Sequence, residues 1–175
     1  MARVSLLDKD QAPPEFQERF QKIEESGRPV LNLFKAMAHS PQVGRRFLGL
    51  GTAILMQGVL PPTLRELAIL RVGQINQANY EWTQHVPIAL RAGVRQEQID
   101  ALAEWEQSPE FNETEKAILR YTDEETLNCR VGDETFAAVR EILSEEGIVE
   151  LTTTIGYYGM VCRILETLQV ELEQS

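Results

Sequence analysis

The sequence predicts an all-α protein with eight or nine helices. Apolar residues recur along almost the whole chain at spacings of three and four, which is the period of one helix face. No segment shows the sustained apolar/polar alternation of a half-buried strand. Because a chain of 175 residues can be organised around one core, a single domain over residues 1–175 is expected.

Three helices are predicted within residues 1–58. The first opens at the Pro13–Pro14 pair and ends near Ser26–Gly27, and a short second helix covers roughly residues 31–37. Ser40–Pro41 then starts a third helix that stops at Gly58. A serine N-cap followed by proline favours a helix start, and glycine favours a stop.

The pattern of residues 59–93 predicts a helical hairpin. Its first helix enters after Pro61–Pro62 and exits near Gln74–Gln77, and its second runs over residues 79–92 before Gly93. The remaining segment, 94–175, predicts four more helices separated by breaker-rich stretches. They are expected over residues 96–105, 113–127, 133–145 and 148–169, with Gly147 as the last separator.

The charge balance disfavours several classes of partner. With 17 Lys and Arg against 27 Asp and Glu, the formal net charge is −10, which repels nucleic-acid backbones and anionic lipid surfaces. There is no apolar signal region before Asp8 and no stretch near the roughly 18 apolar residues of a membrane span. Cys129 and Cys162 are typical of reduced, packed thiols. We therefore expect a cytoplasmic protein that binds neither nucleic acid nor membrane.

Glu81 and His85 form the first candidate functional pair. Four residues apart on a predicted helix, they lie one above the other within hydrogen-bond reach. A carboxylate next to an imidazole raises its proton affinity and produces a group that can exchange a proton near neutral pH. The alternatives are an exposed ion pair worth about 0.3–0.5 kcal/mol, or a satisfied core histidine. Trp82 and Tyr80 add apolar surface and a hydroxyl beside the pair, which favours the functional interpretation.

The segment that contains Glu66, Glu81 and His85 resembles the signature helical hairpin of the carboxymuconolactone decarboxylase and alkylhydroperoxidase-like superfamily. It reads "RELAILRVGQINQANYEWTQHVPIALRAG". The resemblance extends more weakly through "LNLFKAMAHSP" and "VELTTTIGYYGMVCRILETL". It implies an all-helical, oligomeric protein, commonly a trimer or hexamer.

The resemblance also implies a site. In peroxidase members, an upstream glutamate and a histidine that follows a CxxC pair form a proton relay for thiol chemistry, and Glu66 and His85 match those two positions. The thiol positions fall on Ala78 and Glu81, so the dithiol is absent. The lactone-decarboxylase branch, whose members place a glutamate and a histidine on this helix, resembles the "YEWTQH" segment better.

Several of these residues have structural alternatives. Glu66 has the spacing of a capping box with Thr63, which would explain it without catalysis. Arg65 and Arg71 fit a substrate carboxylate, although salt bridges to the many acidic neighbours are the favoured interpretation of both. Tyr157 and Tyr158 are interpreted as core or subunit-contact residues rather than ligands. We expect catalytic roles for Glu66, Glu81 and His85, and substrate contacts for Tyr80, Trp82 and Arg71.

Three functions follow as hypotheses. The first is a cofactor-free lyase that decarboxylates a small carboxylated lactone or related cyclic acid, by acid–base chemistry of the glutamates and the histidine. The second is an alkylhydroperoxidase-like antioxidant protein with peroxiredoxin activity at Cys129 or Cys162. The third is a non-catalytic oligomer that binds a small acid. No cofactor or metal is expected, because there is no His-Glu-x-x-His motif and no cysteine cluster.

Overall fold

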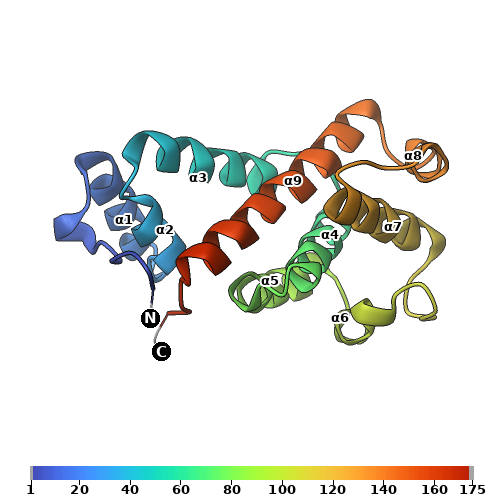
Figure 1. Ribbon diagram of the computed structural model, residues 1–175, viewed down its shortest axis with the longest axis horizontal. Coiled ribbons are helices and arrows are strands. Elements are labelled where there is room, and N and C mark those ends of the chain that lie inside the picture. Colours follow the sequence, from blue (N-terminus) through green and yellow to red (C-terminus); the bar gives the residue numbers. More distant parts are fainter. Residues whose placement is uncertain (1, 174–175) are drawn as a thin grey trace. The chain divides into compact units, whose positions relative to one another are not determined.

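The structure is a computed structural model that describes residues 2–173. Over that span it contains nine α-helices, two short 3₁₀ helices and no strand (Figure 1). The α-helices are α1 (Pro14–Glu25), α2 (Asn32–Met37), α3 (Pro41–Met56), α4 (Pro62–Ile75), α5 (Asn79–Ala92), α6 (Gln96–Ala101), α7 (Glu113–Asn128), α8 (Asp133–Arg140) and α9 (Glu145–Leu168). The 3₁₀ helices are η1 (Lys9–Gln11) and η2 (Leu102–Glu104). The expected all-α class is confirmed.

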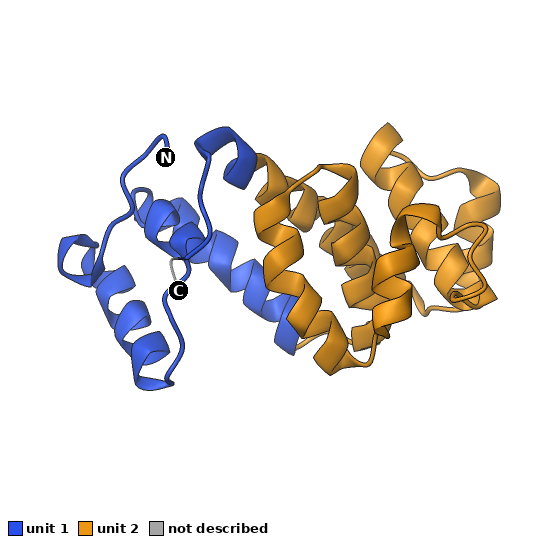
Figure 2. Ribbon diagram, turned by 90° about the horizontal axis from the view of Figure 1, so that it is seen from below, with its two compact units in different colours: residues 1–56, 164–175 blue, residues 57–163 orange. Residues whose placement is uncertain are grey.

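The chain forms two compact units, which Figure 2 shows in different colours. One consists of residues 1–56 and 164–175, and the other of residues 57–163. Every residue discussed below as part of the candidate site belongs to the second unit.

In the first unit, α1 and α3 meet at a position that only glycine can occupy. Phe16 and Phe20 are each 1% exposed and pack edge to face, with ring centroids 5.7 Å apart. A Cβ atom on Gly44 of α3 would lie 2.5 Å from the Met37 carbonyl oxygen and 2.8 Å from the Phe16 ring. No real Cβ contact is that short, so the missing side chain allows the close approach of α3 to α1 and α2.

Helix α4 is the centre of the second unit. It is buried on nearly every side, and it packs chiefly against α5 and α7 (Figure 1). Burial on nearly every side is typical of a core helix rather than an amphipathic surface helix. Its apolar residues join a cluster contributed by α5, α6, η2 and α7: Leu67, Leu70, Ala89, Val94, Ile99, Leu102, Trp105, Phe111 and Leu119.

Glycine and serine set two of the helix boundaries. Gly93 has a φ of 102°, and this left-handed conformation ends α5 where the sequence predicts. The predicted helix over residues 133–145 is too long, because α8 ends at Arg140. Gly147, expected as a separator, lies inside α9: its N–H donates to the Ser144 hydroxyl at 3.2 Å, so Ser144 caps the helix one turn earlier than predicted.

The predicted helix over residues 96–105 is divided into α6 and the 3₁₀ turn η2. Among the described residues, none of the helices is long and apolar enough to cross a membrane.

Candidate active site

Glu66, Glu81 and His85 converge between α4 and α5. The His85 Nδ1–H donates a hydrogen bond to Glu66 Oε2 at 2.8 Å, and the His85 Nε2 forms an ion pair with Glu81 Oε1 at 3.0 Å. Glu66 comes from the core helix α4, whereas Glu81 and His85 lie one turn apart on α5. The structure therefore places one imidazole between two carboxylates, one at each ring nitrogen.

Burial distinguishes this arrangement from a surface ion pair. Glu66 is 0% exposed, Glu81 4% and His85 6%. Burial by itself lowers the pKa of His85, but the Glu66 and Glu81 carboxylates outweigh it and raise the pKa to about 9. His85 is therefore an imidazolium at neutral pH, with a proton on each nitrogen. The exposed ion pair that we considered as an alternative is excluded.

Arg65 completes the charge balance of the cluster. Its Nε donates to Glu66 Oε1 at 3.1 Å, so both oxygens of Glu66 are bonded, and the Arg65 side chain is 10% exposed. The two cations and two carboxylates of the cluster sum to zero. This neutrality matters because an uncompensated charge would be costly at such a buried position.

The capping-box interpretation of Glu66 is wrong. Helix α4 begins at Pro62, its N-cap is Pro61, and no side chain caps it. Thr63 therefore lies two positions past the N-cap and cannot act as the cap. Both Glu66 oxygens are bonded, one to Arg65 and one to His85. Glu66 therefore belongs to the buried cluster, and His85 and the two glutamates form one hydrogen-bonded and ion-paired group.

Tyr158 of α9 reaches the same cluster. Its ring packs edge to face on the His85 ring, with centroids 4.9 Å apart and an interplanar angle of 82°. The residue is 3% exposed. Burial raises the pKa of its hydroxyl well above the usual 10, and the Glu81 and Glu66 charges raise it further. The hydroxyl is therefore a neutral donor at any physiological pH.

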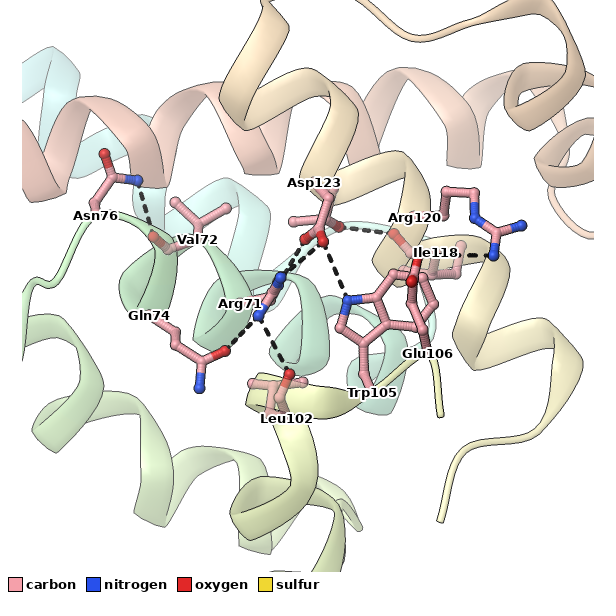
Figure 3. A network of polar contacts seen from close by, with 11 residues as sticks. Arg71, Val72, Gln74, Asn76, Leu102, Trp105, Glu106, Ile118, Arg120 and Asp123 are labelled. Atoms are coloured by element: carbon pink, nitrogen blue, oxygen red, sulfur yellow. Dashed lines mark hydrogen bonds and ion pairs between the residues drawn. The ribbon is translucent and has the colours of Figure 1, made fainter. Parts of the chain in front are cut away.

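The Arg71 side chain lies in a different network, shown in Figure 3. Its Nε and Nη2 bind the two oxygens of Asp123 at 2.6 and 2.7 Å, and its Nη1 donates to Gln74 and to the Leu102 carbonyl. Asp123 also accepts a hydrogen bond from the Trp105 indole at 3.1 Å. The salt-bridge alternative for Arg71 is confirmed, and the structure shows no contact of Arg71 with the three candidate catalytic residues.

Tyr80 and Trp82, the other two residues expected to contact a substrate, are packed within the second unit. Tyr80 is 4% exposed on α5, and Trp82 packs against the hydrophobic core cluster of the second unit. Their contact with a substrate stays a prediction. Tyr157 packs edge to face on Tyr158 at a centroid distance of 5.2 Å.

The cysteines contribute no dithiol. Cys129 is exposed at the end of α7 and Cys162 is fully buried in α9, and they are not joined in a disulfide. Ala78 and Glu81 occupy the two positions at which the resemblance implies thiols. Within residues 2–173 there is no cluster of three or more histidine, cysteine or carboxylate side chains that could hold a metal ion.

The arrangement can store and relay a proton. Glu66 holds the Nδ1 side of His85, which fixes the ring and stabilises its positive charge. The Nε2 side faces Glu81, to which it can pass a proton. Glu81 Oε2 makes no hydrogen bond or ion pair with any described residue. That oxygen is therefore the end of the relay that remains open to a reactant.

Sequence reasoning found the three members of the relay and did not assign Tyr158 to it. Helical spacing reveals neighbours on one helix, such as Glu81 and His85. It carries no information that α9, more than 70 positions along the chain from His85, packs its ring on this site. The aromatic pair in "GYYGM" was the one available signal, and a pair of tyrosines is equally typical of a core.

Comparisons with known proteins identify the family and the fold. The model of the carboxymuconolactone decarboxylase family matches residues 41–124, a segment that contains the whole relay. An uncharacterized protein of Bacillus subtilis, YdfG, is 33% identical over 110 residues, which are 62% of this chain and 75% of YdfG.

Solved structures share the fold over nearly the full length. An uncharacterized peroxidase-related protein from Ralstonia eutropha, described as an alkylhydroperoxidase AhpD core, matches with a TM-score of 0.87 and 19% identity, covering 99% of this chain and 93% of that one. The debrominase Bmp8 matches with a TM-score of 0.81 and 22% identity, covering 97% and 91% of the two chains. A cysteine-to-alanine variant of Bmp8 was solved in complex with 2,3,4-tribromopyrrole.

At these identities the solved structures establish the AhpD-like fold and no shared reaction. The family model and the Bacillus relative establish the family: the chain belongs to the carboxymuconolactone decarboxylase family.

Proposed function

We propose that this protein is a cofactor-free enzyme that transfers a proton to or from a small organic acid, and that its reaction is the decarboxylation of a carboxylated lactone or related cyclic acid. The observation that carries the proposal is the buried Glu66–His85–Glu81 relay with one carboxylate oxygen left unbonded. Family membership supports the class of substrate, and the missing dithiol favours acid–base chemistry over thiol chemistry.

In this proposal Glu81 is the group that meets the substrate. In the resting ion pair Glu81 is ionised, so His85 Nε2 first passes its proton to Glu81, and Glu81 then delivers that proton to the substrate. Glu66 keeps the imidazole ring in place from the other side. Proton exchange between His85 and Glu81 converts an ion pair into two neutral groups. Burial of both side chains favours such an exchange, because separated charges are costly at buried positions.

Decarboxylation needs one proton in each cycle. The bond between the ring carbon and the carboxylate breaks, carbon dioxide leaves, and the electron pair stays on the ring system, where a conjugated carbonyl delocalises it as an enolate. The relay then adds one proton to carbon, and solvent returns one proton to the relay. No oxidant or reductant takes part, so the balance requires none of the cysteines.

Arg65 is the better of the two arginines as an anchor for the substrate carboxylate. Arg71 uses Nε, Nη1 and Nη2 for groups of the protein. Arg65 uses only Nε, and its two Nη groups make no hydrogen bond or ion pair with residues 2–173. Those groups match the fork geometry that binds a carboxylate. We therefore propose Arg65 in place of Arg71 for this role.

The test is turnover of a carboxylated muconolactone in D₂O, followed by NMR and by carbon dioxide release. The wild-type protein is expected to yield a product with one solvent-derived deuterium on carbon. Glu81→Gln and His85→Ala should abolish turnover while the proteins stay folded. His39→Ala and Glu97→Gln are matched controls, because both side chains are exposed and lie outside the relay, and both should retain turnover.

Two other results would overturn the proposal. Rapid consumption of peroxide with loss of a thiol at Cys129 or Cys162 would support the antioxidant hypothesis instead. Tight binding of a carboxylated lactone without carbon dioxide release, unaffected by His85→Ala, would indicate a binding protein.

A further inference from the structure

The tyrosine that packs on the relay histidine carries a hydroxyl without a partner. Tyr158 is 3% exposed, yet its hydroxyl makes no hydrogen bond with any residue in the described part of the chain. The other buried tyrosine hydroxyl whose partner is known, that of Tyr121, bonds the Thr152 hydroxyl at 2.7 Å. Buried tyrosine hydroxyls normally find a partner, because an unmet donor is costly.

The Tyr158 hydroxyl is not sealed inside the protein. The fully buried side-chain atoms that lack a hydrogen bond among residues 2–173 are Glu125 Oε2 and Thr126 Oγ1. The Tyr158 oxygen is not one of them, so it retains access to solvent space. A water molecule or a bound reactant can therefore reach it.

Three polar ends on the buried residues around His85 have no hydrogen-bond partner in the described part of the chain. They are the Tyr158 hydroxyl, the Nη groups of Arg65 and Glu81 Oε2, each on a residue that is at least nine-tenths buried. They come from α9, α4 and α5, and His85 links them through its contacts with Tyr158, Glu66 and Glu81. Two of the ends donate and one can exchange a proton. That set matches a reactant that carries an anionic oxygen next to the carbon that gains or loses a proton.

We propose that the Tyr158 hydroxyl is a catalytic hydrogen-bond donor to the oxygen that becomes negatively charged when the substrate forms its enolate. The inference rests on the proposed function and adds the group that stabilises the intermediate. Tyr158 keeps its proton throughout: it donates a hydrogen bond to the enolate oxygen, and the proton that reaches carbon comes from Glu81. Preorganised donors aimed at developing charge are a general source of rate enhancement.

The first test is Tyr158→Phe, which removes one oxygen and keeps the ring on His85. The probe is 4-nitrophenolate, a stable anion with a delocalised oxygen, whose binding is followed by its visible absorption. Loss of a hydrogen bond to a charged oxygen should weaken its binding on the order of 10- to 100-fold. Nitrobenzene, which has the ring without the anionic oxygen, should bind the variant and the wild type alike. Tyr121→Phe is the matched control and should bind 4-nitrophenolate normally.

Turnover separates this inference from the proposed function. If the proposal holds, Tyr158→Phe lowers turnover of the carboxylated lactone about 100-fold, while an NMR titration still gives His85 a pKa near 9. If the wild type shows no turnover but binds 4-nitrophenolate through Tyr158, the proposed reaction fails and the donor site stands. If Glu81→Gln abolishes turnover while Tyr158→Phe changes neither turnover nor phenolate binding, the reaction stands and the donor role is overturned.

A second measurement does not depend on the variant. The chain has four tyrosines, and all four can be replaced by 3-fluorotyrosine and followed by ¹⁹F NMR. Adding 4-nitrophenolate should move the Tyr158 signal and leave the Tyr121 signal in place. Failure of the wild type to bind 4-nitrophenolate, or binding that leaves the Tyr158 signal unmoved, would overturn the proposal.

Discussion

Helix α4 carries two arginines that bind carboxylates in different ways. Arg71, on the side facing α7, bonds Asp123 through two nitrogens, and Asp123 in turn accepts from Trp105 (Figure 3). Arg65 bonds its neighbour Glu66 through Nε alone, and the cluster around it leaves donor and acceptor groups unused. Both networks are largely buried, and both join α4 to a neighbouring helix.

The difference separates a structural network from a candidate catalytic one. In the Arg71 network each guanidinium nitrogen and both Asp123 oxygens have partners inside the protein, as expected where a charge pair only holds helices together. In the relay the imidazolium is bound at both nitrogens, but Glu81 Oε2, the Arg65 Nη groups and the Tyr158 hydroxyl are available to a reactant. Unused polar groups on buried residues are costly, and function is the usual reason that they persist.

The largest expected effect is on turnover. Glu81→Gln keeps an oxygen to face His85 Nε2 but removes the exchangeable proton, so turnover should fall about 10²- to 10⁴-fold. The free energy of unfolding should fall as well, because the variant leaves one positive charge of the buried cluster uncompensated and lowers the pKa of His85. Steady-state kinetics and urea unfolding of the same preparation measure both. A variant that unfolds but retains turnover in its folded fraction would assign Glu81 to structure.

The opposite pattern is expected in the Arg71 network. Asp123→Ala leaves the Arg71 guanidinium and the Trp105 indole without their acceptor, and should lower the free energy of unfolding by about 2–3 kcal/mol. Turnover by the folded fraction should be unchanged.

The matched control is the Arg95–Glu110 pair, which has the same shortest distance of 2.6 Å as Arg71–Asp123 but is exposed. Glu110→Gln should have no measurable effect on stability, because solvent screens exposed pairs. Equal effects of Asp123→Ala and Glu110→Gln would mean that burial does not set the strength of the Arg71 network.

The pH dependence of stability should depend on His85. Its pKa is raised from 6.5 to about 9 in the folded protein, so its contribution to stability is fully present below pH 6.5 and is lost as the pH rises through 9. The shift corresponds to a stabilisation on the order of 3 kcal/mol. Urea unfolding at pH 6, 7.5 and 9.5 should show this decline in the wild type and not in His85→Gln. An imidazole that titrates near 6.5 by NMR would contradict the two-carboxylate arrangement.

The smallest effect is expected at the edge of the Arg71 network. Trp105→Phe removes the 3.1 Å indole hydrogen bond to Asp123 and keeps most of the buried ring. The free energy of unfolding should fall by about 1 kcal/mol, and turnover should be unaffected. A much larger loss of unfolding free energy would show that Trp105 stabilises this region mainly through packing of its indole ring, rather than through its hydrogen bond to Asp123 of α7.

Most of the fold was predictable because helix formation is local. Apolar spacing and the proline and glycine positions placed the helices, and α5 begins and ends at Asn79 and Ala92, as predicted. The predictions of helix starts and caps were wrong where two local sequence signals competed. Gly147 looked like a break, yet the Ser144 cap one turn earlier starts α9 before it. Thr63 and Glu66 fit a capping box by spacing alone, but Pro61 occupies the N-cap position.

The sequence by itself determined the family hairpin, the all-helical class, and the pairing of Glu81 with His85, because residues four apart on one helix must lie together. Only the tertiary structure decided that Glu66 holds the opposite side of His85, that Tyr158 packs on the same ring, and that Arg65 rather than Arg71 keeps free donors. Each of these depends on which helices pack against α4. Packing also buries the imidazole, which by itself lowers its pKa, and the two carboxylates that packing brings to its ring nitrogens outweigh that effect and keep it protonated.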